Sequence, residues 1–159
     1  MDMIDMNQKA WEIAASAMIR KGKEIECYST GQVRFFFEQA RSSRFEHIIK
    51  EQQDRYSPQP SDGRGGNDPK VIDEMKIRKG IHKKVGSEVI SAMKDLSARD
   101  RMRFVQYLLW NIRIIEQLRG DESKIRQILR AEQVRNPDAV LEKIPKPKFQ
   151  QSCKVSGRR

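Results

Sequence analysis

The sequence predicts an all-α protein, a single-domain bundle of five to six helices with a mobile central loop and a disordered basic tail. Three observations predict this fold. Apolar residues recur at helical spacing along most of the chain, capping signals precede these stretches, and no convincing strand pattern appears. Because 159 residues suit one domain, residues 1–144 are expected to form the bundle and residues 145–159 the tail.

The first helix is expected over residues 3–21, where apolar side chains such as Met6 and Ile13 share one face. Gly22 is expected to end this helix, because glycine is costly inside a helix and suits the position just after one. Residues 23–28 could be extended, but they are too few to found a sheet.

The second helical stretch opens on Ser29 and Gln32, which are spaced as a capping box before an apolar run that begins at Val33. The apolar face rotates at residues 42–43, which predicts a kink or a break there. Helix is then expected to continue to about Tyr56.

Residues 57–68 contain two prolines, three glycines and no apolar side chain, so they are expected to form a mobile loop. Asp68, a capping acid followed by proline, starts a helix that is expected to reach Met93. Gly80 and Gly86 each weaken this helix by about 1 kcal/mol relative to alanine. They therefore predict either a bend or the close approach of another backbone.

The strongest helix signal runs from Ala98 to Arg119. Ser97 and Asp100 are spaced as a capping box, and Gly120 is expected to be the left-handed stop. One broad face should be buried, and it holds Met102, Phe104, Val105, Leu108, Leu109, Ile112 and Ile115. A shorter helix around residues 122–135 and a last short turn over residues 138–144 are expected to follow.

Trp110 lies on the opposite, outer face of this helix together with Arg99, Arg103 and Arg113. In an isolated monomer, this large apolar ring would remain exposed to solvent. With Tyr107 and Ile114 beside it, Trp110 could serve either a subunit contact, where Trp and Tyr are enriched, or the stacking of a base. The sequence leaves these two interpretations about equal.

The net charge of +10 favours a polyanionic partner, namely nucleic acid, an acidic membrane surface or an acidic protein. From Pro145 onward there are five basic residues and no acidic one. For any single cation a solvated surface position is the better expectation, but the excess recurs on several helices. The candidate nucleic-acid-binding residues are Arg34, Arg41, Arg44, Lys76, Lys79, Lys83, Arg99, Arg103 and Arg113.

Other classes of protein find little support in the sequence. No run approaches the roughly 20 apolar residues of a membrane span, and the N-terminus lacks a signal-peptide pattern, so the protein is expected to be cytoplasmic. Cys27 and Cys153 lie far apart, and no structural disulfide is expected.

A catalytic or metal site is not expected either, and neither is a cofactor. His47 and His82 have no metal-ligand spacing to cysteines or carboxylates, and His82 is expected at the surface or rim. Acids flank Cys27, which should raise the pKa of its thiol rather than activate it. The protein is therefore predicted not to be an enzyme.

Residues 29–36, STGQVRFF, resemble the T-x-Q-(I/V)-R-x-(F/L) helix opening of the small subunit of type III CRISPR–Cas effector complexes, and the resemblance extends over roughly residues 5–135. It implies a non-catalytic antiviral subunit whose copies stack along the complex. Such subunits line the groove that holds guide and target RNA, and they bridge the backbone subunits to the large signalling and nuclease subunit. Gln32 and Arg34 match the motif. Arg34 is then a candidate phosphate contact, whereas Gln32 could equally be the capping residue.

Two other functions stay open. The chain could be a helical adaptor that docks an acidic protein partner through the Trp110 face, or a stand-alone basic DNA-binding regulator.

Overall fold

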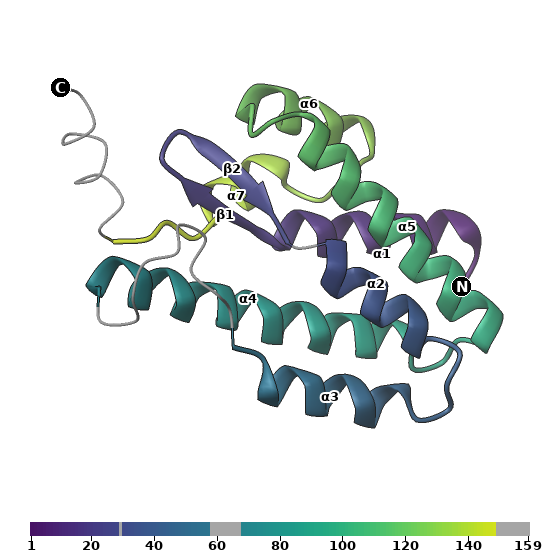
Figure 1. Cartoon of the computed structure of the whole chain (residues 1–159). Coiled ribbons are helices and arrows are strands. Elements are labelled where there is room, and N and C mark those ends of the chain that lie inside the picture. Colours follow the sequence, from purple (N-terminus) through teal and green to yellow (C-terminus); the bar gives the residue numbers. More distant parts are fainter. Residues whose placement is uncertain (29, 58–67, 149–159) are drawn as a thin grey trace, which may run out of the picture.

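The computed structural model describes residues 1–28, 30–57 and 68–148 and confirms the all-α helical bundle (Figure 1). Within these residues the helices are α1 (Met3–Ser16), α2 (Thr30–Gln39), α3 (Phe45–Arg55), α4 (Pro69–Met93), α5 (Ala98–Gln117), α6 (Glu122–Ala131) and α7 (Pro137–Glu142). One small antiparallel hairpin, β1 (Met18–Lys21) and β2 (Glu24–Cys27), follows α1.

Helix α5 lies at the centre of the bundle, because α1 and α2 both pack against it, while α3 lies along α4 (Figure 1). Its predicted apolar face is buried: Phe104, Leu108 and Ile112 have no exposed surface. The predicted start at Ala98 and the left-handed Gly120 are also confirmed, while the helix ends at Gln117, two residues before the predicted Arg119. The Ser97 side chain accepts a hydrogen bond from the Asp100 amide at 3.2 Å, and Gly120 has a φ of 74°.

The hairpin corrects the predicted first helix, which ends at Ser16 rather than at residue 21. Gly22, expected to stop a helix, instead lies in the hairpin turn with a φ of 65°, a conformation that glycine adopts with little strain. The local apolar pattern allowed a helix, but backbone contacts from elsewhere favour the extended form. The Arg20 amide donates to the Pro145 carbonyl at 2.8 Å, and the Tyr28 amide to the Ala17 carbonyl at 2.8 Å.

The predicted break after α2 is confirmed, and a half-buried arginine, Arg101, supports it. The Arg101 guanidinium donates to the carbonyls of Ala40 at 2.7 Å and Leu96 at 2.8 Å, and it lies 4.7 Å from the centroid of the Phe45 ring. This side chain thereby joins the start of α5 to the turn between α2 and α3.

Helix α4 runs without interruption through both of its glycines. A Cβ at Gly86 would lie 1.6 Å from Gln53 Nε2, whereas a Cβ at Gly80 would meet nothing within 4 Å. Gln53 uses this space to donate to the Lys83 carbonyl at 2.8 Å. The predicted close approach is therefore found at Gly86, and it is made by a side chain of α3 rather than by a backbone.

The chain after α7 corrects the predicted start of the tail. The Pro145 carbonyl is bonded to β1, Pro147 is buried, and the Lys148 amide donates to the carboxylate of Asp73 on α4. Residues 145–148 therefore belong to the fold. Most of the predicted loop (58–67) and the rest of the predicted tail (149–159) lie outside the described residues.

Candidate functional site

Three lysines form a row along one side of α4, called here the α4 lysine row (Lys76, Lys79 and Lys83). The spacing of three and four residues places them on the same side of an unbroken helix, and all three are exposed. Within the described part of the chain, none of the three makes an ion pair. The row therefore presents uncompensated positive charge to solvent.

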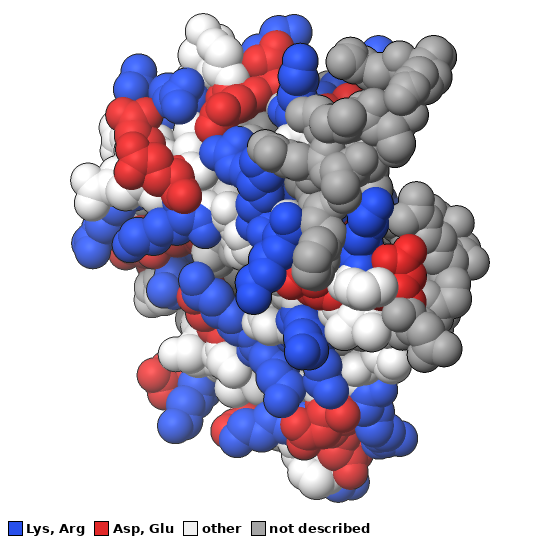
Figure 2. All heavy atoms as spheres, turned by 90° about the vertical axis from the view of Figure 1, so that its left-hand side faces the viewer, with Lys and Arg blue, Asp and Glu red and all other residues white. Residues whose placement is uncertain are grey.

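Three acids of α4 and the hairpin beside it each have a partner outside the row. The carboxylate of Asp73, three residues before Lys76, accepts a hydrogen bond from the Lys148 amide. Glu74 is paired with Arg78 at 3.0 Å and with Lys21 at 3.4 Å, and Glu26 is paired with the same two residues at 2.9 and 3.6 Å. Figure 2 shows the side of the molecule that carries the hairpin turn and the start of α4, where lysine and arginine side chains outnumber the acidic ones among them. None of the three acids is therefore paired with a lysine of the row, and the row can attract an anion.

The predicted arginines lie in a different region from the α4 lysine row. Arg41 and Arg44 are exposed in the turn between α2 and α3, and Arg99 and Arg103 lie at the start of α5 on either side of Arg101. Because Arg101 binds that turn, these four come together around one junction. The end of α4, which leads into the junction, is about 15 Å along the helix axis from the row.

Two further predicted arginines stand apart from both groups. Arg34 is exposed on α2, and Arg113 is exposed on α5 one turn beyond Trp110. Of all the predicted arginines, only Arg103 has an ion pair within the described residues, a long contact of 3.8 Å to Asp100. The nine predicted cations are thus all at least partly exposed, but they do not form one surface.

Sequence reasoning overlooked Arg101, which has a structural role. The sequence does place Arg101 on the apolar face of the helix. It lies three, four and seven residues before Phe104, Val105 and Leu108 and therefore shares their buried face. A cation on the apolar face of a helix requires partners, which are the carbonyl oxygens described above.

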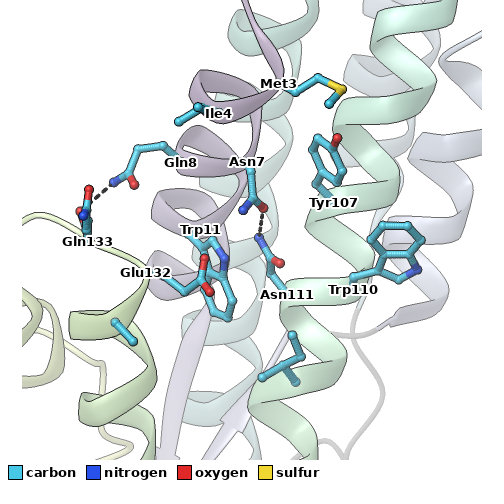
Figure 3. Close-up of a pocket in the computed structure, with 12 residues that line it drawn as sticks. Met3, Ile4, Asn7, Gln8, Trp11, Tyr107, Trp110, Asn111, Glu132 and Gln133 are labelled. Carbon is cyan, nitrogen blue, oxygen red and sulfur yellow. Dashed lines mark hydrogen bonds between the residues drawn. The ribbon is translucent and has the colours of Figure 1, made fainter.

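A groove of about 550 Å³ lies between α1, α5 and the end of α6 and is called here the Trp110 groove (Figure 3). The structure brings together the three residues of the predicted patch, because Tyr107, Trp110 and Ile114 all line it. Trp110 is 50% exposed, and Met3 and Ile4 on the α1 wall are 55% and 80% exposed. The described chain thus leaves most of its large exposed apolar side chains at this one place.

Hydrogen bonds fix the floor and the far wall of the groove. Asn111 donates to the side chain of Asn7 at 3.3 Å, and Gln8 donates to the Gln133 carbonyl at 2.9 Å (Figure 3). Trp11 lies beneath and is only 2% exposed. These contacts tie α1 to α5 and to the end of α6, so the groove is formed before any partner binds.

His82 is buried, which corrects the prediction of a surface or rim position. Its Nε2 donates to Gln52 Oε1 at 2.8 Å, since that oxygen can only accept, and its Nδ1 therefore accepts from the Tyr28 hydroxyl. The Tyr56 ring stacks on the imidazole at a centroid distance of 3.8 Å. Burial lowers the pKa of His82 to about 4, so the ring is neutral at pH 7.

Gln32, one of the two motif residues, belongs to the same network. Its side-chain oxygen accepts a hydrogen bond from Gln52 at 3.0 Å. In this chain Gln32 therefore joins α2 to α3, and Arg34 is the motif residue that remains available to a ligand.

Neither cysteine chemistry nor a metal site is evident in the described residues. Desolvation raises the pKa of the Cys27 thiol to about 12; burial rather than the flanking acids is the main cause of the predicted rise. No group of three histidine, cysteine or acidic side chains in the described chain could hold a metal ion. Of the described helices, none is both long enough and apolar enough to cross a bilayer. Comparison with family models, curated proteins and solved structures finds no match to the chain.

Proposed function

We propose that the chain is a non-catalytic small subunit of an RNA-guided type III CRISPR–Cas antiviral effector complex. The resemblance of residues 29–36 suggests the kind of complex, and the side-chain positions are compatible with it. Val33 and Phe36 have no exposed surface, whereas Arg34 is exposed. The apolar positions of the motif thus serve the core and its arginine faces outward.

The α4 lysine row is the observation that carries the proposed contact with RNA. Exposed lysines without ion pairs attract phosphate groups and release counterions when they bind them. Lysine is a point charge and reads no base edge, so the contact is with the backbone of guide and target RNA and is independent of sequence. Arg34 and the arginines around the α2–α3 junction would contact the same polyanion further along the molecule.

The Trp110 groove is the proposed site of contact with other subunits. Tryptophan and tyrosine are enriched in protein interfaces, and Met3 and Ile4 give the groove a second apolar wall. This neighbourhood favours a protein contact over base stacking for Trp110. The proposed occupants are a stacked second copy of the chain and, at the ends of the stack, the backbone subunits and the large signalling and nuclease subunit.

RNA binding by a Lys76→Gln, Lys79→Gln, Lys83→Gln variant tests this function. The three changes remove charge without touching an ion pair, so the fold should be unaffected. We expect weaker binding of single-stranded RNA and a slope of log K against log salt that is shallower by about 2, which is about 0.7 for each lost phosphate contact. Fluorescence anisotropy over a salt series measures both quantities.

A matched control removes three lysines from other faces: Lys9→Gln, Lys50→Gln and Lys94→Gln. Lys9 and Lys50 are already paired with Glu12 and Glu46, and Lys94 follows the far end of α4. The control has the same net charge as the α4 variant and should retain most of the RNA affinity. Equal losses in the two variants would mean that only net charge matters, and the α4 lysine row would have no special role.

The groove also favours a second candidate function, a helical adaptor that docks an acidic protein through the Trp110 face. In that case Trp110 would be needed for capture of the partner, and RNA would be absent from the complex.

A further inference from the structure

The segment that follows α7 is held against the body of the protein by backbone groups. The Arg20 amide donates to the Pro145 carbonyl and the Lys148 amide donates to Asp73, while the Arg20 side chain donates to the carbonyl of Leu141 in the last turn of α7 itself at 2.7 Å. The buried Ile144 (7% exposed) and Pro147 add apolar anchors. None of these contacts uses the side chain of a lysine. The fold therefore holds the segment in place, and the lysine side chains take no part in holding it.

This segment runs beside α4 (Figure 1). A pocket of about 340 Å³ separates the two and is lined by Ile77, Gly80 and Lys84 from α4 and by Lys143 and Pro145 from the segment. Asp73, Ile77, Gly80 and Lys84 follow one another at helical spacing and so share one face of α4. At 100° per residue, the α4 lysine row lies about a quarter-turn from that face.

We propose that Lys143, Lys146 and Lys148 form a second lysine row beside the first, and that the two rows together hold the phosphate backbone of RNA. This inference rests on the proposed function and extends the binding surface to residues outside the region of family resemblance. All three side chains are exposed, and none makes an ion pair within the described residues. The acids closest to them along the chain or by contact are Glu142 and Asp73.

The surroundings of the two rows favour a nucleic acid over a protein. Protein interfaces gain most of their affinity from a few large apolar or aromatic anchors. Among the described residues the large exposed apolar side chains lie at the N-terminus and in the Trp110 groove, and Ile72 alone lies near the rows. Two rows of unpaired lysines without such anchors suit a ligand that is recognised by its phosphates.

Neutralising the second row tests the proposal, with the full chain and a labelled single-stranded RNA of mixed sequence. Lys143→Gln, Lys146→Gln and Lys148→Gln leave the docking contacts in place, because these use backbone atoms. We expect binding about tenfold weaker at moderate salt and a salt dependence shallower by about 2 in log–log slope. Circular dichroism should show an unchanged fold, and the Lys→Arg triple variant at the same positions should restore binding.

The outcomes separate this proposal from the proposed function. Weak binding in both row variants, with the Lys9/Lys50/Lys94 control unaffected, supports the two-row surface. If only the α4 variant loses RNA affinity, and the second-row variant binds RNA as well as the control does, this inference is overturned and the proposed function stands. A wild-type protein that binds no RNA overturns both. Retention of poly-glutamate in place of RNA, lost in the second-row variant, would assign the surface to an acidic protein and would also overturn the proposal.

Discussion

His82 is the residue on which four elements of the fold meet. It belongs to α4 and is bonded to Tyr28 after β2 and to Gln52 of α3, which in turn binds Gln32 of α2. The buried imidazole favours the neutral state, because burial desolvates the charged form of the ring and lowers its pKa. The network thereby couples the packing of α2, α3 and α4 to pH.

The stability of the protein should fall as pH drops below the ordinary pKa of histidine. His82 has a pKa of about 4 in the folded state against 6.5 when unfolded, so between these values the unfolded chain binds the extra proton. Its contribution is complete above about pH 6.5 and is lost as pH falls toward 4, by on the order of 2 to 3 kcal/mol. Urea unfolding at a series of pH values measures this loss.

His82→Gln should lower stability at pH 7 and flatten the pH dependence between pH 6.5 and 4. His47 is the matched control, since it is an exposed histidine on α3. His47→Gln should keep the wild-type dependence. A His82→Gln curve parallel to that of the wild type would show that other groups cause the acid sensitivity.

Single residues also mark the limit of sequence reasoning. The burial of His82 could not be derived from its neighbours in sequence alone, because the oxygen atom that accepts from its ring comes from a distant segment, the side chain of Gln52 on α3. The outward position of Trp110 was predictable, because the period of a single helix determines it.

At the scale of elements, α5 could be predicted from its own sequence and the hairpin could not. Helix α5 carries its own cap, period and stop, so its bounds could be predicted closely. The hairpin could not be predicted from its local sequence, because Met18 and Ile19 are both buried and so do not alternate as strand residues usually do. Its partner Pro145 lies more than a hundred residues away, and only tertiary structure brings the two together.

The two glycines of α4 give a paired test of the helix packing. Gly86→Ala should destabilise the protein by about 1 to 2 kcal/mol, because the methyl group displaces Gln53 from its hydrogen bond to the Lys83 carbonyl. Gly80→Ala should instead stabilise it by about 0.5 to 1 kcal/mol, since the added methyl group meets nothing and alanine is the better helix former. Thermal or urea unfolding distinguishes the two. Equal effects of the same sign would contradict the packing described at Gly86.

At the scale of the whole molecule, the two lysine rows and the apolar Trp110 groove lie in different places. The Trp110 groove lies between α1, α5 and α6, and the lysine rows lie on α4 and the segment after α7. The sequence could predict that both kinds of surface exist. It could not predict that the α4 lysine row and the junction arginines would lie apart, because the arrangement of helices in space decides that. Nor could it predict that residues 145–148 would dock.

With this separation, the proposed subunit would be able to contact RNA and other subunits at the same time. The most direct measurement is a tagged pull-down from the native cell, in which the nuclease-protected nucleic acid is sequenced and the co-purifying proteins are identified. A Trp110→Ala variant, which changes a half-exposed side chain and should leave the core intact, is analysed in parallel.

If the chain is the proposed subunit, the pull-down should recover short RNAs that share one repeat-derived end, together with several larger proteins. The Trp110→Ala variant should recover fewer of these proteins, while the isolated variant should still bind RNA in solution. Partner proteins recovered from the wild type without any protected RNA would contradict the proposed function and would favour the adaptor function instead.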